Sequence, residues 1–235
     1  QGFEFWRTLE CTHNYNKSIY YADTPKKLQW EGYDAIAQTR ETETYLKTRA
    51  ADGKPFSLFL SWGPPHAPYH SAPAEFQKMF DGKDLTLRGN VPKEREAMAR
   101  KLYHGYYAHM ATMDKCLGDL MATLKATGLD KNTILVYTSD HGDMLQSHGF
   151  MKKQQPWEES LRVPFLLRHP DAAVRARRLT TLIDTPDIMP TLLSMCDVDI
   201  PAGVQGTDMS GVMTGKKPAE DRAGLMSCPQ PFAQW

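Results

Sequence analysis

The sequence has no excess of charge of either sign and no long apolar run. Lys plus Arg and Asp plus Glu number 28 each, a balance that gives no sign of a nucleic-acid or anionic membrane surface. No stretch approaches the roughly 18 apolar residues that a membrane-spanning helix needs. With 41% hydrophobic and 24% charged residues, the composition is that of an ordinary globular domain of 235 residues.

Cysteine is also scarce. The sequence contains four scattered cysteines that form no CxxC pair: Cys11, Cys116, Cys196 and Cys228. This spacing argues against a zinc site or a dithiol redox centre. We expect free and mostly buried thiols instead of disulfides. The chain begins at Gln1 without a visible signal peptide, so its residues do not identify a compartment.

Three segments have the apolar periodicity of helices: residues 33–51, 92–127 and 185–195. The second is the clearest, because Leu, Met and Tyr recur along it every three or four residues. We predict that its apolar side chains, from Met98 through Met110 to the C-terminal turn, form core. Gly128 suits the C-terminal cap of this helix.

Three short apolar runs predict buried strands: residues 55–62, 133–139 and 162–170. Residues 1–31 and 201–221 are predicted as loop, and residues 223–228 as the start of a further strand. Strands that alternate with helices indicate an α/β fold with a mostly parallel sheet flanked by helices. Such a sheet usually has about five or six strands, so three strands indicate an internal part of a larger domain.

Polar clusters follow two of the predicted strands. Residues 55–62 lead into His66, and residues 133–139 lead into Asp140 and His141. In α/β sheets the functional groups lie beyond the carboxyl ends of the strands. Two neighbouring parallel strands would therefore bring both clusters to the same edge of the sheet.

Asp140 and His141 are candidate metal ligands, because they supply an anionic oxygen and a neutral nitrogen beside the flexible Gly142. The alternative is a helix N-cap or an Asx-turn at Asp140. Asp143 is interpreted as a turn or capping carboxylate. A hard divalent cation prefers about six oxygen-rich ligands, and no DD or DxD motif follows another predicted strand. Either the chain binds no metal, or further ligands lie outside it.

Three basic side chains are candidate anion contacts. His66 lies in the stiff segment PPHAPY and is interpreted as an anion contact or proton donor, with a structural loop histidine as the alternative. Lys152 and Lys153 follow the second polar cluster, where a lysine can contact sulfate or phosphate. The alternative is that these two lysines are simply solvated.

In this order and spacing, the motifs resemble the sulfatase family of the alkaline-phosphatase-like superfamily. FSLFLSWGPPHAPYHSAP is similar to the family's strand and histidine loop. TILVYTSDHGDMLQSHGFMKKQQPWEESLRVPFLLRHP is similar to its metal strand, lysine loop and closing strand. The resemblance implies a partial catalytic domain with three parts: an irregular and helical part at 1–54, core α/β units at 55–200, and the start of a C-terminal region at 201–235.

The resemblance implies a reaction and a cofactor. A formylglycine, made from Cys or Ser in a C/S-x-P/A-x-R motif, would attack the sulfur of a sulfate ester. A divalent cation, most often Ca²⁺ with Mg²⁺ or Mn²⁺ as alternatives, would neutralise sulfate oxygens together with basic residues. The implied substrate is a sulfated small molecule or carbohydrate, and the implied compartment is periplasmic or extracellular. Neither a nucleic-acid partner nor an oligomeric state is implied.

The family's site residues carry over onto matching positions. Asp140 and His141 match the second metal-ligand pair, although many members have Asn where this chain has His141. His66 matches the histidine that contacts the sulfate or the leaving oxygen. Lys153 matches the single lysine of the following loop, and Lys152 is its alternative.

One further residue matches the family pattern, and two features of that pattern are missing from this sequence. His148, in an S/E-H-G segment, is expected to line the pocket as a third catalytic candidate. None of the four cysteines lies in the nucleophile motif, and the family's N-terminal aspartate pair is missing. We therefore expect an incomplete part of a sulfatase, inactive alone, with a half-complete metal site that can stay empty.

Two other functions remain open. A phosphodiesterase or phosphonate monoester hydrolase of the same superfamily would share the metal pair and the helix pattern. A non-catalytic sulfatase-like binding protein would keep only the fold. The nucleophile segment distinguishes them: C/S-x-P/A-x-R favours a sulfatase, and an unprocessed Thr or Ser favours phosphatase chemistry.

Overall fold

The computed structural model describes residues 2–9, 11–171, 173–174 and 176–224. Within these ranges the chain forms two compact units. Of the described residues, the first unit comprises those from 2 to 133 and from 138 to 165, and the second those from 134 to 137 and from 166 to 224. The predicted division near residues 54 and 200 stays a prediction.

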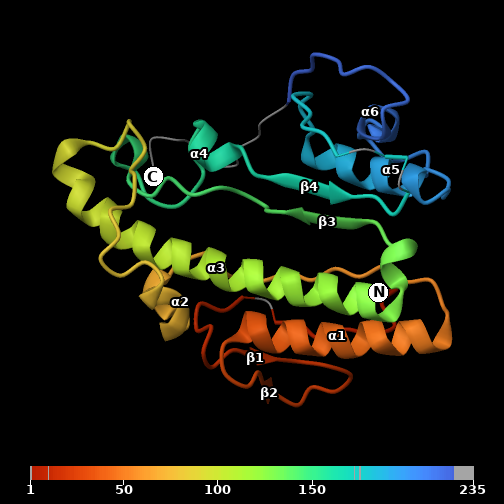
Figure 1. The fold of residues 1–235 in the computed structure, drawn as a ribbon, viewed down its shortest axis with the longest axis horizontal. Helices are drawn as coiled ribbons and strands as arrows, with labels where there is room; N and C mark the ends of the chain where they lie inside the picture. The colour runs from red at the N-terminus through yellow and green to blue at the C-terminus, as the bar shows by residue number, and fades with distance from the viewer. Residues whose placement is uncertain (1, 10, 172, 175, 225–235) are drawn as a thin grey trace. The chain divides into compact units, whose positions relative to one another are not determined.

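Two long helices, α1 (Asp34–Asp52) and α3 (Glu96–Thr127), dominate the first unit and pack side by side (Figure 1). Both end at a glycine in the left-handed region, Gly53 with φ 65° and Gly128 with φ 77°, where a side chain would be strained. The two predicted helices are therefore confirmed. The second begins at Glu96, after a short 3₁₀ turn, instead of at residue 92.

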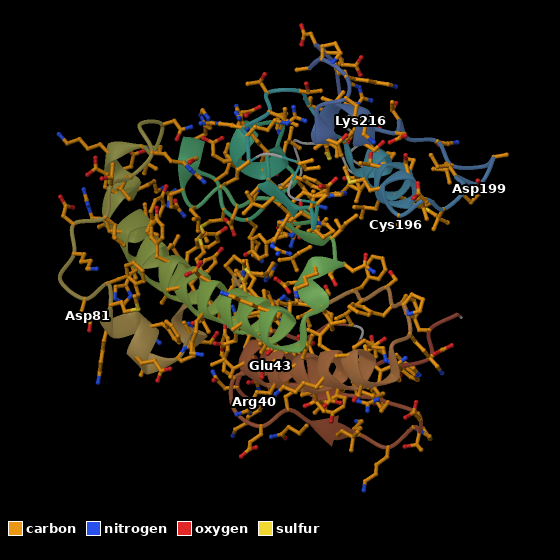
Figure 2. All side chains as sticks on the ribbon, turned by 45° about the vertical axis from the view of Figure 1, so that its right-hand side comes forward. Arg40, Glu43, Asp81, Cys196, Asp199 and Lys216 are labelled. Carbon is orange, nitrogen blue, oxygen red and sulfur yellow. The ribbon has the colours of Figure 1, made fainter. Side chains whose placement is uncertain are left out.

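One face of α3 forms core, while its other face remains exposed. Ala99, Tyr103 and Leu120 are buried. Met98 and Met110, predicted as core, are 51% and 43% exposed. The prediction was wrong for these two, because a long straight helix covers its partners with only one stripe of side chains. Charged residues such as Arg40 likewise lie on the exposed face of α1 (Figure 2).

The N-terminal segment is more ordered than predicted. Its strands β1 (Ile19–Tyr20) and β2 (Leu28–Gln29) pair in antiparallel fashion. The rings of Tyr20 and Trp30 stack with centroids 3.9 Å apart. The prediction of loop over residues 1–31 was therefore wrong here, because aromatic stacking across the strands stabilises a short hairpin that has no apolar run.

The apolar run at residues 55–62 does not form a strand in the described structure. Its side chains alternate between exposed and half-buried, and Phe59 is 78% exposed. This alternation is typical of an extended segment with one face covered. The prediction of a buried strand was wrong because a strand also needs a hydrogen-bonded neighbour, and none pairs with this segment among the described residues.

The second unit contains a short sheet and two helices. The strands β3 (Leu135–Thr138) and β4 (Phe165–Arg168) confirm two of the three predicted strands and pair with each other. Their side chains are mostly half-buried, which corrects the prediction that they are buried. Helix α5 (Thr185–Met195) confirms the third predicted helix and is capped by Asp184. Helix α6 (Ser210–Thr214) was missed in a segment predicted as loop. The strand predicted at 223–228 lies mostly outside the described residues.

Short helical segments complete the fold. They are α2 (Ala74–Lys78), α4 (Glu158–Leu161) and the 3₁₀ turns η1 (Tyr69–Ser71), η2 (Lys93–Arg95), η3 (Leu129–Lys131) and η4 (Ser147–Gly149). Of the three cysteines described, all are free, as expected, but Cys11 and Cys196 are exposed, which corrects the expectation of mostly buried thiols. No helix in the described part of the chain is long and apolar enough to cross a membrane.

Candidate functional site

His66 and Lys153 meet in the first unit, although they lie far apart in the sequence. The Nζ atom of Lys153 lies 2.9 Å from Nε2 of His66. Both side chains are half-buried. His66 stands in the Pro-rich loop between α1 and α3, and Lys153 stands in the loop that follows β3. The structure thus brings together two candidate residues from separate loops.

The hydrogen bonds of His66 indicate its tautomer. Its Nδ1 lies 2.9 Å from the carbonyl oxygen of Ala67, so Nδ1 carries a proton and donates it. Nε2 then has a free lone pair that accepts from Lys153. Burial lowers the pKa of His66 below its ordinary value, and the nearby charge of Lys153 lowers it further, while the bond to Ala67 opposes both. His66 is therefore a neutral imidazole at neutral pH.

Asp140 and His141 follow β3 directly and lie beside each other. Oδ2 of Asp140 is 3.4 Å from Nε2 of His141. Nδ1 of His141 donates to the carbonyl oxygen of Gly142 at 2.8 Å, which leaves Nε2 unprotonated. A backbone partner of this kind commonly orients a metal-bound histidine. The two side chains thus fit as part of a divalent-cation site.

This pair is only part of a metal site in the described chain. Among the described residues, no group of three or more His, Cys, Asp or Glu side chains is arranged to hold a metal. The His141 ring lies edge-on to the His66 ring, with centroids 6.2 Å apart. The candidate metal pair and the His66–Lys153 pair are therefore neighbours.

The Asp143 carboxylate holds the two loops together. Its Oδ1 accepts the N–H of Leu145 at 3.1 Å, which confirms the predicted turn carboxylate. Its Oδ2 accepts the hydroxyl of Tyr69 at 2.6 Å. Because Tyr69 lies in the same segment as His66 (residues 63–71, the histidine loop), this bond links that loop to the segment that carries Asp140. Burial and the negative charge of Asp143 raise the pKa of Tyr69, which keeps its hydroxyl a donor.

The lysine loop has an unusual backbone. Five residues other than glycine adopt positive φ angles between Leu145 and Gln154. Such conformations cost energy and persist only where surrounding contacts enforce them. Arg88 supplies some of these contacts, since its Nη1 donates to the carbonyl oxygen of Asp143 at 3.0 Å. The loop is thus held in a single strained shape.

Gly142 is required at the start of this loop. A Cβ atom at this position would lie 2.1 Å from the carbonyl oxygen of Glu159. The N–H of Gly142 donates to the carbonyl oxygen of Ser160 at 2.8 Å. The backbone at position 142, next to His141, therefore lies so close to the segment around α4 that only glycine fits there.

Lys152 and His148 do not join the His66–Lys153 pair by any contact in the described structure. Lys152 is exposed, and its carbonyl oxygen accepts the N–H of Met144 at 2.7 Å. His148 stacks on Trp157, with centroids 4.6 Å apart, and its Nε2 lies 3.0 Å from Nδ2 of Asn90. Catalytic or substrate-binding roles for these residues stay predictions.

His13 was missed by the sequence reasoning. Its ring lies 4.8 Å from the ring of His66, measured between centroids. It belongs to the aromatic N-terminal segment, in which no pattern distinguishes a site residue from a surface residue. Only the packing of this segment against the His66 loop identifies it.

Comparisons with known proteins identify the family of the chain. The sulfatase family model matches residues 1–198. An ulvan-active sulfatase of Formosa agariphila is 39% identical over 237 residues, which cover 99% of this chain and 46% of that protein. An endo-4-O-sulfatase of Bacteroides thetaiotaomicron is 31% identical and covers 92% of this chain and 44% of that protein.

Solved structures support the same conclusion. The structure of a sulfatase from Bacteroides fragilis, yidJ, superposes with a TM-score of 0.86 at 28% identity, and covers 92% of this chain and 49% of that chain. The chain spans about half the length of the curated relatives it matches. The chain belongs to the sulfatase family and has its alkaline-phosphatase-like α/β fold.

Proposed function

We propose that the whole protein hydrolyses sulfate esters with the help of a divalent cation. One observation carries this proposal. The Nζ atom of Lys153 lies 2.9 Å from Nε2 of His66, and the Asp140–His141 pair is next to them. The arrangement combines a cation, a proton-accepting nitrogen and a candidate metal pair. These groups are suited to stabilising the anionic oxygens of a sulfate ester and the alcohol oxygen that departs from it.

His66 and Lys153 would act on the sulfate and on the leaving oxygen. The ammonium of Lys153 would neutralise charge on a sulfate oxygen. The neutral His66 can take a proton at Nε2 and pass it to the departing alcohol oxygen. The ammonium of Lys153, which donates to that nitrogen at 2.9 Å, would keep its own proton, and the hydroxyl proton that the nucleophile releases would reach His66 through solvent. The hydrogen bond from Nδ1 to Ala67 keeps the ring in this orientation.

Asp140 and His141 would hold the cation, with Ca²⁺ as the first candidate and Mg²⁺ or Mn²⁺ as alternatives. A bound cation would supply Lewis acidity to the sulfate. We place the remaining metal ligands and the formylglycine nucleophile in another part of the parent protein. This placement is supported by the absence of a C-x-P/A-x-R motif at the four cysteines and by relatives of about twice this length.

A sulfated carbohydrate is the proposed substrate. Two relatives are named as an ulvan-active sulfatase and an endo-4-O-sulfatase, and they match nearly the whole chain. Ulvan oligosaccharides are therefore the first substrate to test. The balanced charge of the sequence, with 28 basic and 28 acidic residues, gives no indication of a nucleic-acid partner.

The test uses the full-length protein loaded with Ca²⁺ and measures sulfate released from ulvan oligosaccharides and from 4-nitrophenyl sulfate. Asp140→Ala should lower both the bound calcium, measured by elemental analysis, and the turnover by about 10²-fold or more, the scale of a lost charge-stabilising group. Asp199→Ala, at an exposed carboxylate labelled in Figure 2, is the control and should change neither. Full calcium content in Asp140→Ala would contradict its role as a ligand.

The alternative functions are decided by the same preparation. One relative, 28% identical, is named a multifunctional alkaline phosphatase superfamily protein of Trinickia caryophylli. If kcat/KM is higher for a phosphonate monoester or for bis(4-nitrophenyl) phosphate than for every sulfate ester, the sulfatase proposal is wrong. Binding of ulvan oligosaccharides without release of sulfate would instead indicate a non-catalytic protein.

A further inference from the structure

The N-terminal segment around Tyr15 is docked on the loop that carries His66. The hydroxyl of Tyr15, which is buried, donates to the carbonyl oxygen of Ala67 at 3.2 Å. Nδ2 of Asn16 donates to the carbonyl oxygen of Ser71 at 3.0 Å. A segment distant in sequence is therefore fixed to both halves of the histidine loop.

The fit between the two segments is close. A Cβ atom on Gly63 would lie 2.7 Å from the Tyr15 ring, so only glycine allows this ring to approach. The Tyr15 ring also packs edge-on against the ring of Tyr33 in the core. Because Tyr15 is anchored on both sides, the residue two positions before it has a defined place.

His13 occupies that place, beside His66. Its ring lies at 40° to the His66 ring with centroids 4.8 Å apart. Unlike His66, it is exposed, and no hydrogen bond joins its ring nitrogens to another described residue. An imidazole with free nitrogens can both donate to and accept from a hydroxyl group.

The groups around His66 divide into two kinds. Lys153 and the Asp140–His141 pair are the groups suited to sulfate oxygens and a cation. His13 comes from the N-terminal segment, and it is neither one of the sulfate-binding groups nor one of the candidate metal ligands. A sulfate ester held at Lys153 with its bridging oxygen at His66 has its alcohol portion left for other contacts, and His13 is the exposed polar side chain against His66.

We propose that His13 is a specificity-determining residue that hydrogen-bonds the sugar hydroxyls on the alcohol side of the sulfate ester. The proposal rests on the proposed sulfatase function. His13 would add a substrate contact from the N-terminal segment. The close packing of Tyr15 against the His66 loop holds this segment in position. His13 would therefore matter for a carbohydrate substrate and much less for a small aryl sulfate.

The experiment compares His13→Ala with the wild-type protein, both full-length and Ca²⁺-loaded. The ratio of kcat/KM for ulvan oligosaccharides to kcat/KM for 4-nitrophenyl sulfate should fall about tenfold, the loss typical of one hydrogen bond. His13→Asn, which keeps a donor and an acceptor, should restore part of that ratio. His70→Ala is the matched control, because His70 is also an exposed histidine but lies in the loop that carries His66. This variant should leave the ratio unchanged.

Each remaining outcome also decides the question. An equal loss on both substrates would overturn the proposal, because His13 would then only support His66. An unchanged ratio would overturn it too. If the wild-type protein releases no sulfate at all, the proposed function fails, and titration calorimetry with ulvan oligosaccharides takes over. Binding weakened about tenfold in His13→Ala but not in His70→Ala would still support the contact, and equal binding or none would refute it.

Discussion

Lys152 and Lys153 are chemically alike, yet the backbone gives them different surroundings. Lys152 adopts a positive φ of 64° and is exposed, while its carbonyl oxygen holds the loop to Met144. The Lys153 side chain is half-buried, and its Nζ reaches Nε2 of His66 at 2.9 Å. The proposed sulfate contact is therefore Lys153, and Lys152 contributes mainly through its main chain.

This difference predicts unequal effects of substitution in the full-length protein. Lys153→Ala should lower kcat/KM for 4-nitrophenyl sulfate by about 10²- to 10³-fold, the usual cost of removing one group that stabilises developing charge. Lys152→Ala, the matched control, should stay within about threefold, because exposed charges contribute little. The measurement is steady-state kinetics at one calcium concentration. The reverse order would show that the substrate lies on the Lys152 side of the loop.

At the scale of an element, α3 carries two glycines in very different environments. A Cβ atom on Gly105 would lie 2.3 Å from the carbonyl oxygen of Tyr69, so the helix touches the histidine loop through this residue. A Cβ atom on Gly118 would meet nothing within 4 Å. The first glycine allows close packing, and the second is a weak point in an exposed part of the helix.

We expect opposite effects from the two alanine variants. Gly105→Ala should destabilise the protein by about 1–3 kcal/mol, because the backbone of Tyr69 must move. It should also lower activity, since Tyr69 links the His66 loop to Asp143. Gly118→Ala should stabilise by roughly 0.5–1 kcal/mol through helix propensity. Denaturant unfolding followed by circular dichroism measures both, and equal effects would contradict the observed packing.

The helices and strands show which local sequence patterns are sufficient to predict an element. The C-terminal ends of α1 and α3 were predictable, because Gly53 and Gly128 adopt the left-handed conformation that ends a helix, and this preference is local. The extended run at 55–62 was not assigned correctly, because strand formation depends on a neighbour that no local pattern reveals. The short hairpin of β1 and β2 was missed because its stability comes from the Tyr20–Trp30 stack across the strands.

At the scale of the whole molecule, one buried charge influences stability. Asp34 is only 2% exposed, and its Oδ1 has no hydrogen-bond partner among the described residues. Burial raises the pKa of Asp34 from 3.8 to about 6, although hydrogen bonds from the backbone of Ala35 and the hydroxyl of Ser18 oppose this. Folding therefore binds a proton at this carboxyl, and stability falls as the pH rises from about 4 to 6.

Asp34→Asn should remove this penalty. At pH 8 the variant should be more stable than the wild type by about 1–3 kcal/mol, since one pKa unit corresponds to about 1.4 kcal/mol. Near pH 4 the difference should nearly vanish, because the native carboxyl is then neutral in the folded protein. Asp114→Asn, at an exposed carboxylate of α3, is the control. A difference that does not change with pH would exclude an ionised Asp34 as the cause.

The sequence by itself determined the three long helices, the residue types of the candidate site and the family, because periodicity, caps and motifs act over short stretches. It identified His66, Lys153, Asp140 and His141 as candidates without showing how they meet. Only the tertiary structure decided that Lys153 reaches His66 while His148 stacks on Trp157. It alone placed His13 against His66, since that contact depends on packing between segments far apart in the chain.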